Sequence, residues 1–168
     1  MNSNKKQAGF SLIELLIVVA IIGIIAAIAI PNLLASRRAA NEGSALASMR
    51  VIFSSEATYQ ATAGAGQFGS LADLRTLGLI DQVLASATAA SQQKSGYVFG
   101  ASTVAVSGLP AFNATAIASA HTAANPITGT GSRAFYVNES GVMYYNATAA
   151  APTCTATTAR TVTGTVLN

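Results

Sequence analysis

Residues 10–31 read FSLIELLIVVAIIGIIAAIAIP, and this stretch decides the architecture of the chain. From Leu15 to Ile30 it holds sixteen consecutive residues without a polar side chain. A helix needs about 20 apolar residues to cross the hydrocarbon layer of a membrane, so the run extended back to Phe10 is long enough for one span. No later stretch of the sequence repeats it. We therefore expect at most one membrane pass.

The composition excludes several classes of protein. Of the 168 residues, 51% are hydrophobic and only 9% are charged, which does not suit a disordered chain. The formal net charge is +3, but Lys5 and Lys6 supply two of these charges before the apolar run begins. The seven other basic residues and the six acidic residues leave +1. No motif or basic surface for binding nucleic acid is expected.

The residues that carry catalysis or bind metal are scarce. The chain has one histidine, His121, and one cysteine, Cys154. A zinc site needs three or four ligands, and one cysteine forms no internal disulfide. The acidic residues are scattered without a close pair: Glu14, Glu42, Glu56, Asp73, Asp81 and Glu139. We expect no enzyme, no metal and no cofactor, but a chain that assembles.

Three interpretations of the apolar run compete. It could be a secretory signal peptide, for which Ala27-Ile28-Ala29 offers a small-residue cleavage site, or a plain membrane anchor. The third is a helix that lies first in lipid and later in a protein core. Glu14 favours the third, because a carboxylate costs about 2.5–3.5 kcal/mol near the bilayer centre, less near the end of a span. In an assembly, this acid can pair with a cation and fix the register between chains.

The stretch KKQAGFSLIELLIVVAIIGIIAAIAIP, which begins at Lys5, resembles the class III signal and N-terminal helix of type IV pilins and pseudopilins, and the resemblance spans roughly residues 5–40. The resemblance combines a short basic leader, Gly9, the hydrophobic Phe10, and Glu14 at a fixed spacing. It implies that a prepilin peptidase cleaves between Gly9 and Phe10 and methylates the new amino terminus, which gives N-methylphenylalanine. It also implies that Glu14, about one helical turn further along, pairs with that amine when subunits dock.

Two residues inside the run weaken a helix. Gly23 lowers the helix propensity by about 1 kcal/mol relative to alanine, and Pro31 removes a backbone donor and clashes with the preceding turn. In filaments of the family, the helix is locally melted between a glycine and a proline at these places. The resemblance therefore implies an extensible weak point between Gly23 and Pro31. The alternative is a simple kink.

Beyond Pro31 the pattern becomes amphipathic, and Gly64-Ala65-Gly66 marks the end of the helix. Most charged side chains are expected off the apolar face, with Arg38 and Glu42 spaced to pair along the helix. The predicted apolar face consists of Ala35, Ala39, Leu46, Met49, Phe53 and Ala57, and the charged residues off it are Arg37, Arg38, Arg50 and Glu56.

The rest of the chain predicts a small head. Ser70 to Leu77 has the pattern of a short capped helix, and residues 82–94 are expected to form a helical turn or a loop, of which the loop is favoured. Residues 96–100 and 103–106 are expected to form one strand or a bent pair. Further strands are expected at 134–137 and 142–146 with a hairpin turn at 138–141, and residues 161–163 have the alternation of an edge strand. Residues 107–132 are expected to form a long loop.

These expectations combine into an α+β pilin fold. A long N-terminal helix over residues 10–62, kinked near Pro31, packs its C-terminal half on an antiparallel sheet of three or four strands. Residues 1–9 form the removed leader, residues 10–30 the transmembrane or filament-core segment, and residues 63–168 the globular head.

The predicted function is that of a structural subunit of a type IV pilus-like filament. The resemblance implies a single-pass precursor in the bacterial inner membrane and then an extracellular pilus that serves adhesion, twitching motility or DNA uptake. The implied partners are copies of the chain, minor pilins, the prepilin peptidase and an inner-membrane assembly platform. A pseudopilin of a type II secretion system and a single-pass membrane-anchored domain of another kind stay open as alternatives.

Overall fold

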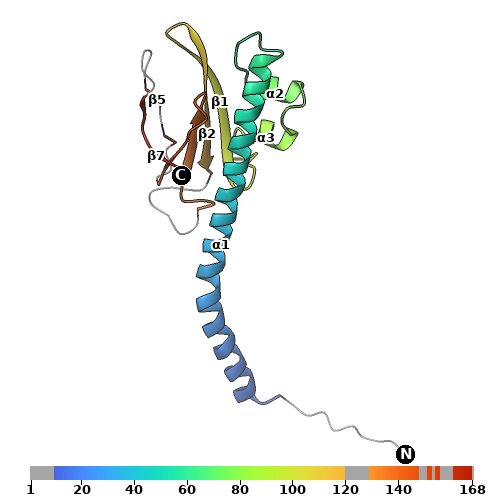
Figure 1. Cartoon of the computed structure of the whole chain (residues 1–168). Coiled ribbons are helices and arrows are strands. Elements are labelled where there is room, and N and C mark those ends of the chain that lie inside the picture. The colour runs from blue at the N-terminus through green and yellow to red at the C-terminus, as the bar shows by residue number, and fades with distance from the viewer. Residues whose placement is uncertain (1–9, 120–128, 148–150, 153, 156–160, 168) are drawn as a thin grey trace, which may run out of the picture. The chain divides into compact units, whose positions relative to one another are not determined.

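The structure is a computed structural model, and Figure 1 shows its helices and strands. It divides into two compact units, Met1–Ser36 and Arg37–Asn168. It describes residues 10–119, 129–147, 151–152, 154–155 and 161–167. The predicted leader, with Lys5, Lys6 and Gly9, and also His121 lie outside the described residues.

The first element is the helix α1, Leu12–Ala61. Its residues up to Ser36 belong to the first unit and those from Arg37 belong to the second. The helix is continuous through Gly23 and Pro31, although proline has no N–H to donate to the preceding turn. The melted segment between these two residues therefore stays a prediction.

Two short helices follow in the second unit, α2 (Leu71–Thr76) and α3 (Gln82–Ser86). The predicted capping box of α2 is confirmed, because Ser70 and Asp73 each accept a hydrogen bond from the other's backbone N–H. Over α3 the favoured loop is wrong, and the helical turn given as its alternative is confirmed. Asp81 caps this helix by accepting a hydrogen bond from the Leu84 N–H at 3.1 Å, and the Leu84 side chain is buried in the core.

The second unit contains an antiparallel sheet of five strands in the order β1-β2-β3-β4-β7. The predicted hairpin between β3 and β4 is confirmed. The sheet exceeds the three or four strands predicted, because β2 and the edge strand β7 both join it. A separate two-stranded ladder pairs β5 with β6. The strands are β1 (Tyr97–Val106), β2 (Leu109–Ala118), β3 (Ala134–Asn138), β4 (Met143–Asn146), β5 (Cys154–Thr155), β6 (Thr161–Val162) and β7 (Thr165–Val166).

Strand β2 corrects the long loop predicted for residues 107–132. It pairs with β1 over its whole length, from Tyr97 opposite Ala118 to Val106 opposite Leu109. Ser107 and Gly108 form the two-residue turn, with φ angles of 51° and 79°, as tight hairpin turns require. The strand was missed because its buried positions are mostly alanines, which have little intrinsic preference for strands.

The core of the second unit lies among α1, the sheet, α2 and α3, and the end of α3 meets β1, where the Phe99 N–H donates to the Ala87 carbonyl at 2.7 Å. Large side chains from all of these elements fill it, including Met49, Ile52, Leu74, Leu84, Phe99, Phe112 and Phe135. The helical face predicted from the sequence is partly wrong. Ala35, Ala39 and Ala57 are exposed, whereas Glu42 and Glu56 are buried. The buried face is therefore rotated toward two acidic side chains that find partners in the head.

Candidate assembly site

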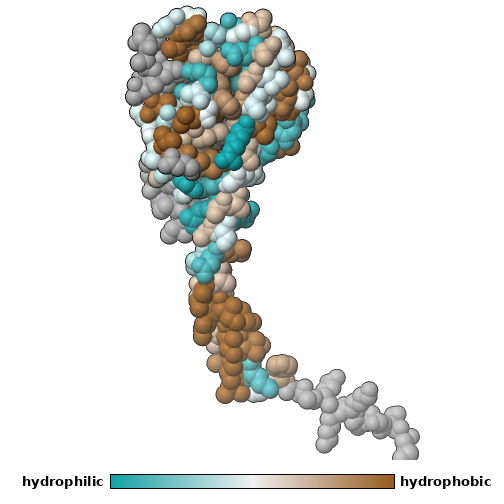
Figure 2. All heavy atoms as spheres, in the orientation of Figure 1, coloured by the Kyte–Doolittle hydropathy of each residue, from teal (hydrophilic) through white to brown (hydrophobic). Residues whose placement is uncertain are grey.

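The first unit presents an apolar helix with nothing packed on it among the described residues. Phe10 is 85% exposed and Leu12 is 80% exposed. Every large apolar side chain from there to Leu33 is exposed, and Figure 2 shows these side chains as one continuous hydrophobic stretch of α1. By length and composition, the helix can cross a membrane. An exposed apolar surface of this extent marks a site that lipid or protein covers.

Glu14 lies in the first turn of α1, where its carboxylate caps the helix. Its Oε2 accepts a hydrogen bond from the Ser11 backbone N–H at 2.9 Å. The order Ser11-Leu12-Ile13-Glu14 matches the spacing of a capping box, a signal that the sequence analysis missed. The acid satisfies one of the unpaired amides at the helix start and opposes the positive end of the helix dipole. Phe10 directly precedes this turn.

In the second unit, the buried Glu42 holds the segment before β3 on α1. Its Oε1 accepts hydrogen bonds from the N–H and the Oγ of Ser132, both at 2.7 Å. Its Oε2 accepts from Nε of Arg133 at 2.8 Å and lies 2.7 Å from Nη2. Burial raises the pKa of Glu42, but the bonds from Ser132 and the charge of Arg133 outweigh it and lower the pKa overall. The sequence predicted a pair between Glu42 and Arg38, and it did not predict Ser132 or Arg133 as partners.

The same segment is held by two further contacts. Asn41 donates from Nδ2 to the Thr130 carbonyl at 2.8 Å, and the Tyr97 hydroxyl donates to the Arg133 carbonyl at 2.8 Å. Burial is the main reason that the pKa of the Tyr97 hydroxyl lies well above its usual value, and the charge of Glu42 adds to this rise. Three side chains therefore hold this segment, Asn41 and Glu42 from α1 and Tyr97 from β1.

Glu56 is a second buried acid on α1, and its side chain is 0% exposed. Its Oε2 accepts a hydrogen bond from the Gly69 N–H at 3.0 Å, while Oε1 has no hydrogen-bond partner among the described residues. Burial raises the pKa of Glu56, the Gly69 N–H lowers it, and the negative charge of Asp73 raises it further. The sequence pattern predicted that Glu56 lies off the apolar face of the helix, whereas its side chain is buried. Nothing in its local pattern predicts the loop that covers it.

The described residues contain no group of three or more histidine, cysteine or acidic side chains that could hold a metal ion. The predicted site residues fall into two sets. Phe10 precedes α1 and Glu14 lies in its first turn, while Gly23 and Pro31 lie further along the same apolar helix. Gly9 is outside the described residues.

Comparison with known proteins finds matches to part of this chain. The family model of the prokaryotic N-terminal methylation motif matches residues 4–30. The chain is 63% identical over 38 residues to the type IV wide pilus major component of Thermus thermophilus, covering 23% of this chain and 29% of that protein. It is 41% identical over 56 residues to the type IV major pilin protein of Myxococcus xanthus, covering 33% of this chain and 26% of that protein.

These matches confirm the predicted resemblance to type IV pilins, and they define how far it reaches. The chain spans less than a third of the length of the curated relatives that it matches. No solved structure matches the chain significantly. The methylation motif contains Phe10, Glu14 and Gly23, so these residues lie inside the matched segment.

Proposed function

We propose that this chain, which has the N-terminal segment of a type IV pilin, is a structural subunit of a type IV pilus-like filament. The observation that carries the proposal is the exposed apolar helix of the first unit, which overlaps the N-terminal methylation motif over residues 12–30. Its side chains need an apolar environment, and two are available in turn. The precursor crosses the inner membrane once, and the assembled subunit is covered by copies of itself.

Processing completes the start of this helix. The prepilin peptidase cleaves between Gly9 and Phe10 and methylates the amine of Phe10. That amine places a positive charge at a helix start whose dipole is already positive there, which costs about 0.3–1 kcal/mol at an exposed site. Glu14 supplies the opposite charge within one turn, and its Oε2 already accepts from the Ser11 N–H. Its other oxygen is available for the amine of its own or a neighbouring chain.

The segment between Gly23 and Pro31 supplies extensibility. It is helical in the isolated chain, but Pro31 lacks the N–H that would bond to the carbonyl of Ala27. Gly23 adds the conformational freedom that opposes a helix. When neighbouring subunits or lipid offer equivalent apolar cover, few backbone hydrogen bonds must break for this segment to extend. The inner-membrane assembly platform and minor pilins act on the subunit at this stage.

Mass spectrometry of the chain recovered from sheared surface filaments tests the processing. The proposal expects a first residue of Phe10 with one added methyl group. An intact leader, or a chain that begins at Ile30 as ordinary signal-peptide cleavage would leave it, would overturn it. Recovery from long surface filaments also separates a pilin from a pseudopilin of a type II secretion system, whose product would be absent from that fraction.

The Glu14→Ala variant tests the role of the acid in assembly. Removal of the carboxylate makes the helix more apolar, so we expect the precursor to enter the membrane and to be cleaved as before. Filament yield should fall because the amine of Phe10 has lost its counter-charge. Ser11→Ala, which leaves the Glu14 carboxylate in place, is the matched control. Normal filament growth by the Glu14→Ala variant would remove the assigned role.

A further inference from the structure

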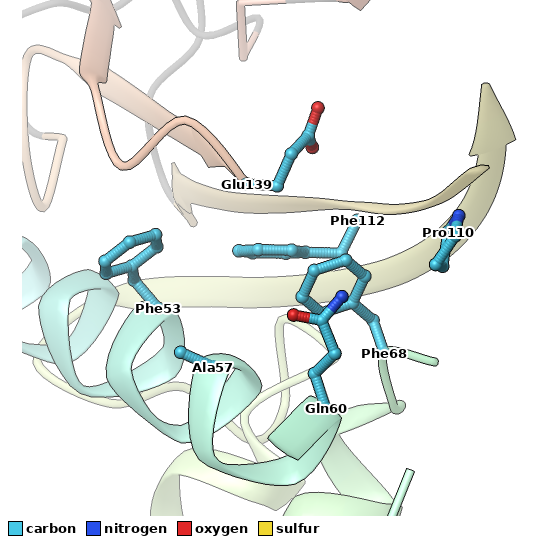
Figure 3. Close-up of a pocket in the computed structure, with 7 residues that line it drawn as sticks. All are labelled: Phe53, Ala57, Gln60, Phe68, Pro110, Phe112 and Glu139. Atoms are coloured by element: carbon cyan, nitrogen blue, oxygen red, sulfur yellow. The ribbon is translucent and has the colours of Figure 1, made fainter. Parts of the chain in front are cut away.

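An open hollow of about 200 Å³ lies in the second unit between α1, β2 and the turn after β3 (Figure 3). Three phenylalanines line it, Phe53 from α1, Phe68 from the loop before α2, and Phe112 from β2. The Phe112 ring centroid lies 4.9 Å from that of Phe68 and 6.4 Å from that of Phe53. We call this hollow the aromatic bowl. Its volume suits one amino-acid side chain.

The polar groups of the aromatic bowl are acceptors. Gln60 donates from Nε2 to the Gly66 carbonyl at 3.2 Å, which fixes the orientation of its amide. Its Oε1 therefore lies on the side that faces Phe53, as Figure 3 shows. Glu139 lies at the rim and adds a negative charge. None of the residues that line the bowl is basic.

This combination selects a cationic donor. The faces of aromatic rings are negative and attract cations, and amide and carboxylate oxygens accept hydrogen bonds. A guanidinium group satisfies both requirements, because it is flat, always charged, weakly hydrated and rich in N–H groups. An aliphatic side chain would fill the hollow but would leave the Gln60 oxygen without a donor.

In a filament, a second copy of the chain can supply the guanidinium group, so the inference rests on the proposed function. Subunits that repeat along a filament contact each other through two different patches. Arg37 is exposed and lies 16 residues before Phe53, about 24 Å along α1 by its rise per residue. Arg50 is within one turn of Phe53, and Arg133 is bound to Glu42. Arg37 is therefore the exposed arginine of α1 farthest from the bowl.

We propose that the aromatic bowl of one subunit receives the Arg37 guanidinium of the next subunit in the filament. The guanidinium stacks on the phenylalanine rings and donates to Oε1 of Gln60. Glu139 at the rim attracts the cation and lies beside it once the side chain is seated. The contact joins two copies through their second units, in addition to the packing of their apolar helices.

Cross-linking within filaments tests the contact. In a Cys154→Ser background, Arg37→Cys is combined with Ala57→Cys, an exposed position that lines the bowl, and sheared filaments are treated with a short bismaleimide. We expect covalent dimers and higher multiples on a denaturing gel. The matched control is Ala47→Cys with Ala57→Cys, in which the first cysteine is also exposed on α1 but lies nearer the bowl. Each single-cysteine chain should stay monomeric.

The outcomes separate the two proposals. If the Cys154→Ser chain forms filaments but the Arg37→Cys pair cross-links no better than the Ala47→Cys pair, the bowl contact is wrong and the pilin function stands. If the Cys154→Ser chain and the unsubstituted chain both fail to form filaments in their own host, the proposed function fails and the inference falls with it.

A second set of variants tests the chemistry of recognition. Phe68→Leu keeps an apolar wall but removes an aromatic face, while Phe68→Tyr keeps the ring. In an otherwise unsubstituted chain, Arg37→Lys keeps the charge and Arg37→Gln removes it. We expect Phe68→Leu and Arg37→Gln to lower the temperature at which isolated filaments dissociate, and the two conservative variants to lower it less. If Phe68→Tyr lowers the dissociation temperature as much as Phe68→Leu, and Arg37→Lys as much as Arg37→Gln, the bowl does not recognise a cation.

Discussion

Glu42 and Glu56 occupy the same buried face of α1, but their environments shift their pKa in opposite directions. Glu42 is surrounded by donors, and its pKa is lowered despite burial. Glu56 has one donor and the nearby negative charge of Asp73, and its pKa is raised. A buried carboxylate is stabilising only when hydrogen bonds and an opposite charge replace the water that it loses. The two acids therefore make opposite contributions to the pH dependence of folding.

We predict that Glu56→Gln stabilises the head at neutral pH by about 1 kcal/mol, the usual scale of a single substitution, because it removes a negative charge that burial and Asp73 disfavour. Glutamine keeps an oxygen for the Gly69 N–H and carries no charge. Because the native pKa is raised, the folded chain binds the proton more tightly, and its stability falls as the pH rises from the ordinary value of 4.5 through the raised value. The advantage of the variant should therefore disappear below about pH 4.5.

Thermal unfolding in detergent, followed by the near-ultraviolet signal of tyrosine, measures this effect. All five tyrosines lie in the second unit and the chain has no tryptophan, so the signal reports the head alone. Ser54→Ala, an exposed change close by on α1, is the control. A variant less stable than the parent at pH 7 would contradict the assignment of Glu56 as a destabilising charge.

We predict the reverse for Glu42→Gln, which should destabilise the head by about 2 kcal/mol at pH 7. It removes the charge that Arg133 binds, a loss reduced by the partial exposure of Arg133 to water. The native pKa of Glu42 is lowered, so its contribution is complete above the ordinary value of 4.5 and is lost as the pH falls through the lowered value. The two chains should become equally stable in acid. A difference independent of pH in the same unfolding measurement would contradict this account.

At the scale of elements, the sequence predicts those features that local pattern determines. The long helix, the capped helix α2 and the hairpin at 138–141 all follow from periodicity, capping residues and turn residues. Strand β2 does not follow from local pattern, because Ala114, Ala116 and Ala118 become strand residues only through the neighbours they pack against.

The candidate site divides in the same way. Phe10 and Glu14 follow from a short motif, and the capping bond from Ser11 could have been predicted from the same spacing. The partners of Glu42 could not have been predicted from a local motif, since Ser132 and Arg133 are about 90 residues away in the chain.

The β3–β4 hairpin depends on Gly141, which has a φ of +75° and faces the Phe53 ring. A Cβ at this position would lie 2.9 Å from Cζ of Phe53. Gly108 in the β1–β2 turn has a similar φ of +79° but open space around it. We predict that Gly141→Ala costs more stability than Gly108→Ala, which should cost about 1–2 kcal/mol from backbone strain alone.

The double variant Gly141→Ala with Phe53→Leu separates strain from contact. Leucine has no atom at the position of the distal ring carbon, so the added cost at Gly141 should shrink when Phe53 is shortened, a coupling that a double-mutant cycle measures. Thermal unfolding of the four chains gives this coupling. Strictly additive effects would show that Phe53 does not limit the turn.

For the whole molecule, the division into two units separates the tasks of association and folding. The first unit has large exposed apolar side chains along its helix and no core of its own among the described residues. The second unit contains the core and both buried acids. A change in the first unit should therefore alter membrane insertion and polymerisation, while a change in the core of the second should alter folding.

We predict that residues 37–168 alone form a folded, water-soluble monomer. Their core consists of side chains that lie entirely within this range, and the exposed apolar helix that drives association is absent. Residues 10–168 should require detergent and associate when it is removed, because more than a dozen large apolar side chains on the first unit become exposed to water. Analytical ultracentrifugation gives the mass of each, and the tyrosine signal shows whether the head is folded. A fragment 37–168 that aggregates despite a native signal, or residues 10–168 that remain monomeric in plain buffer, would contradict the assignment of assembly to the first unit.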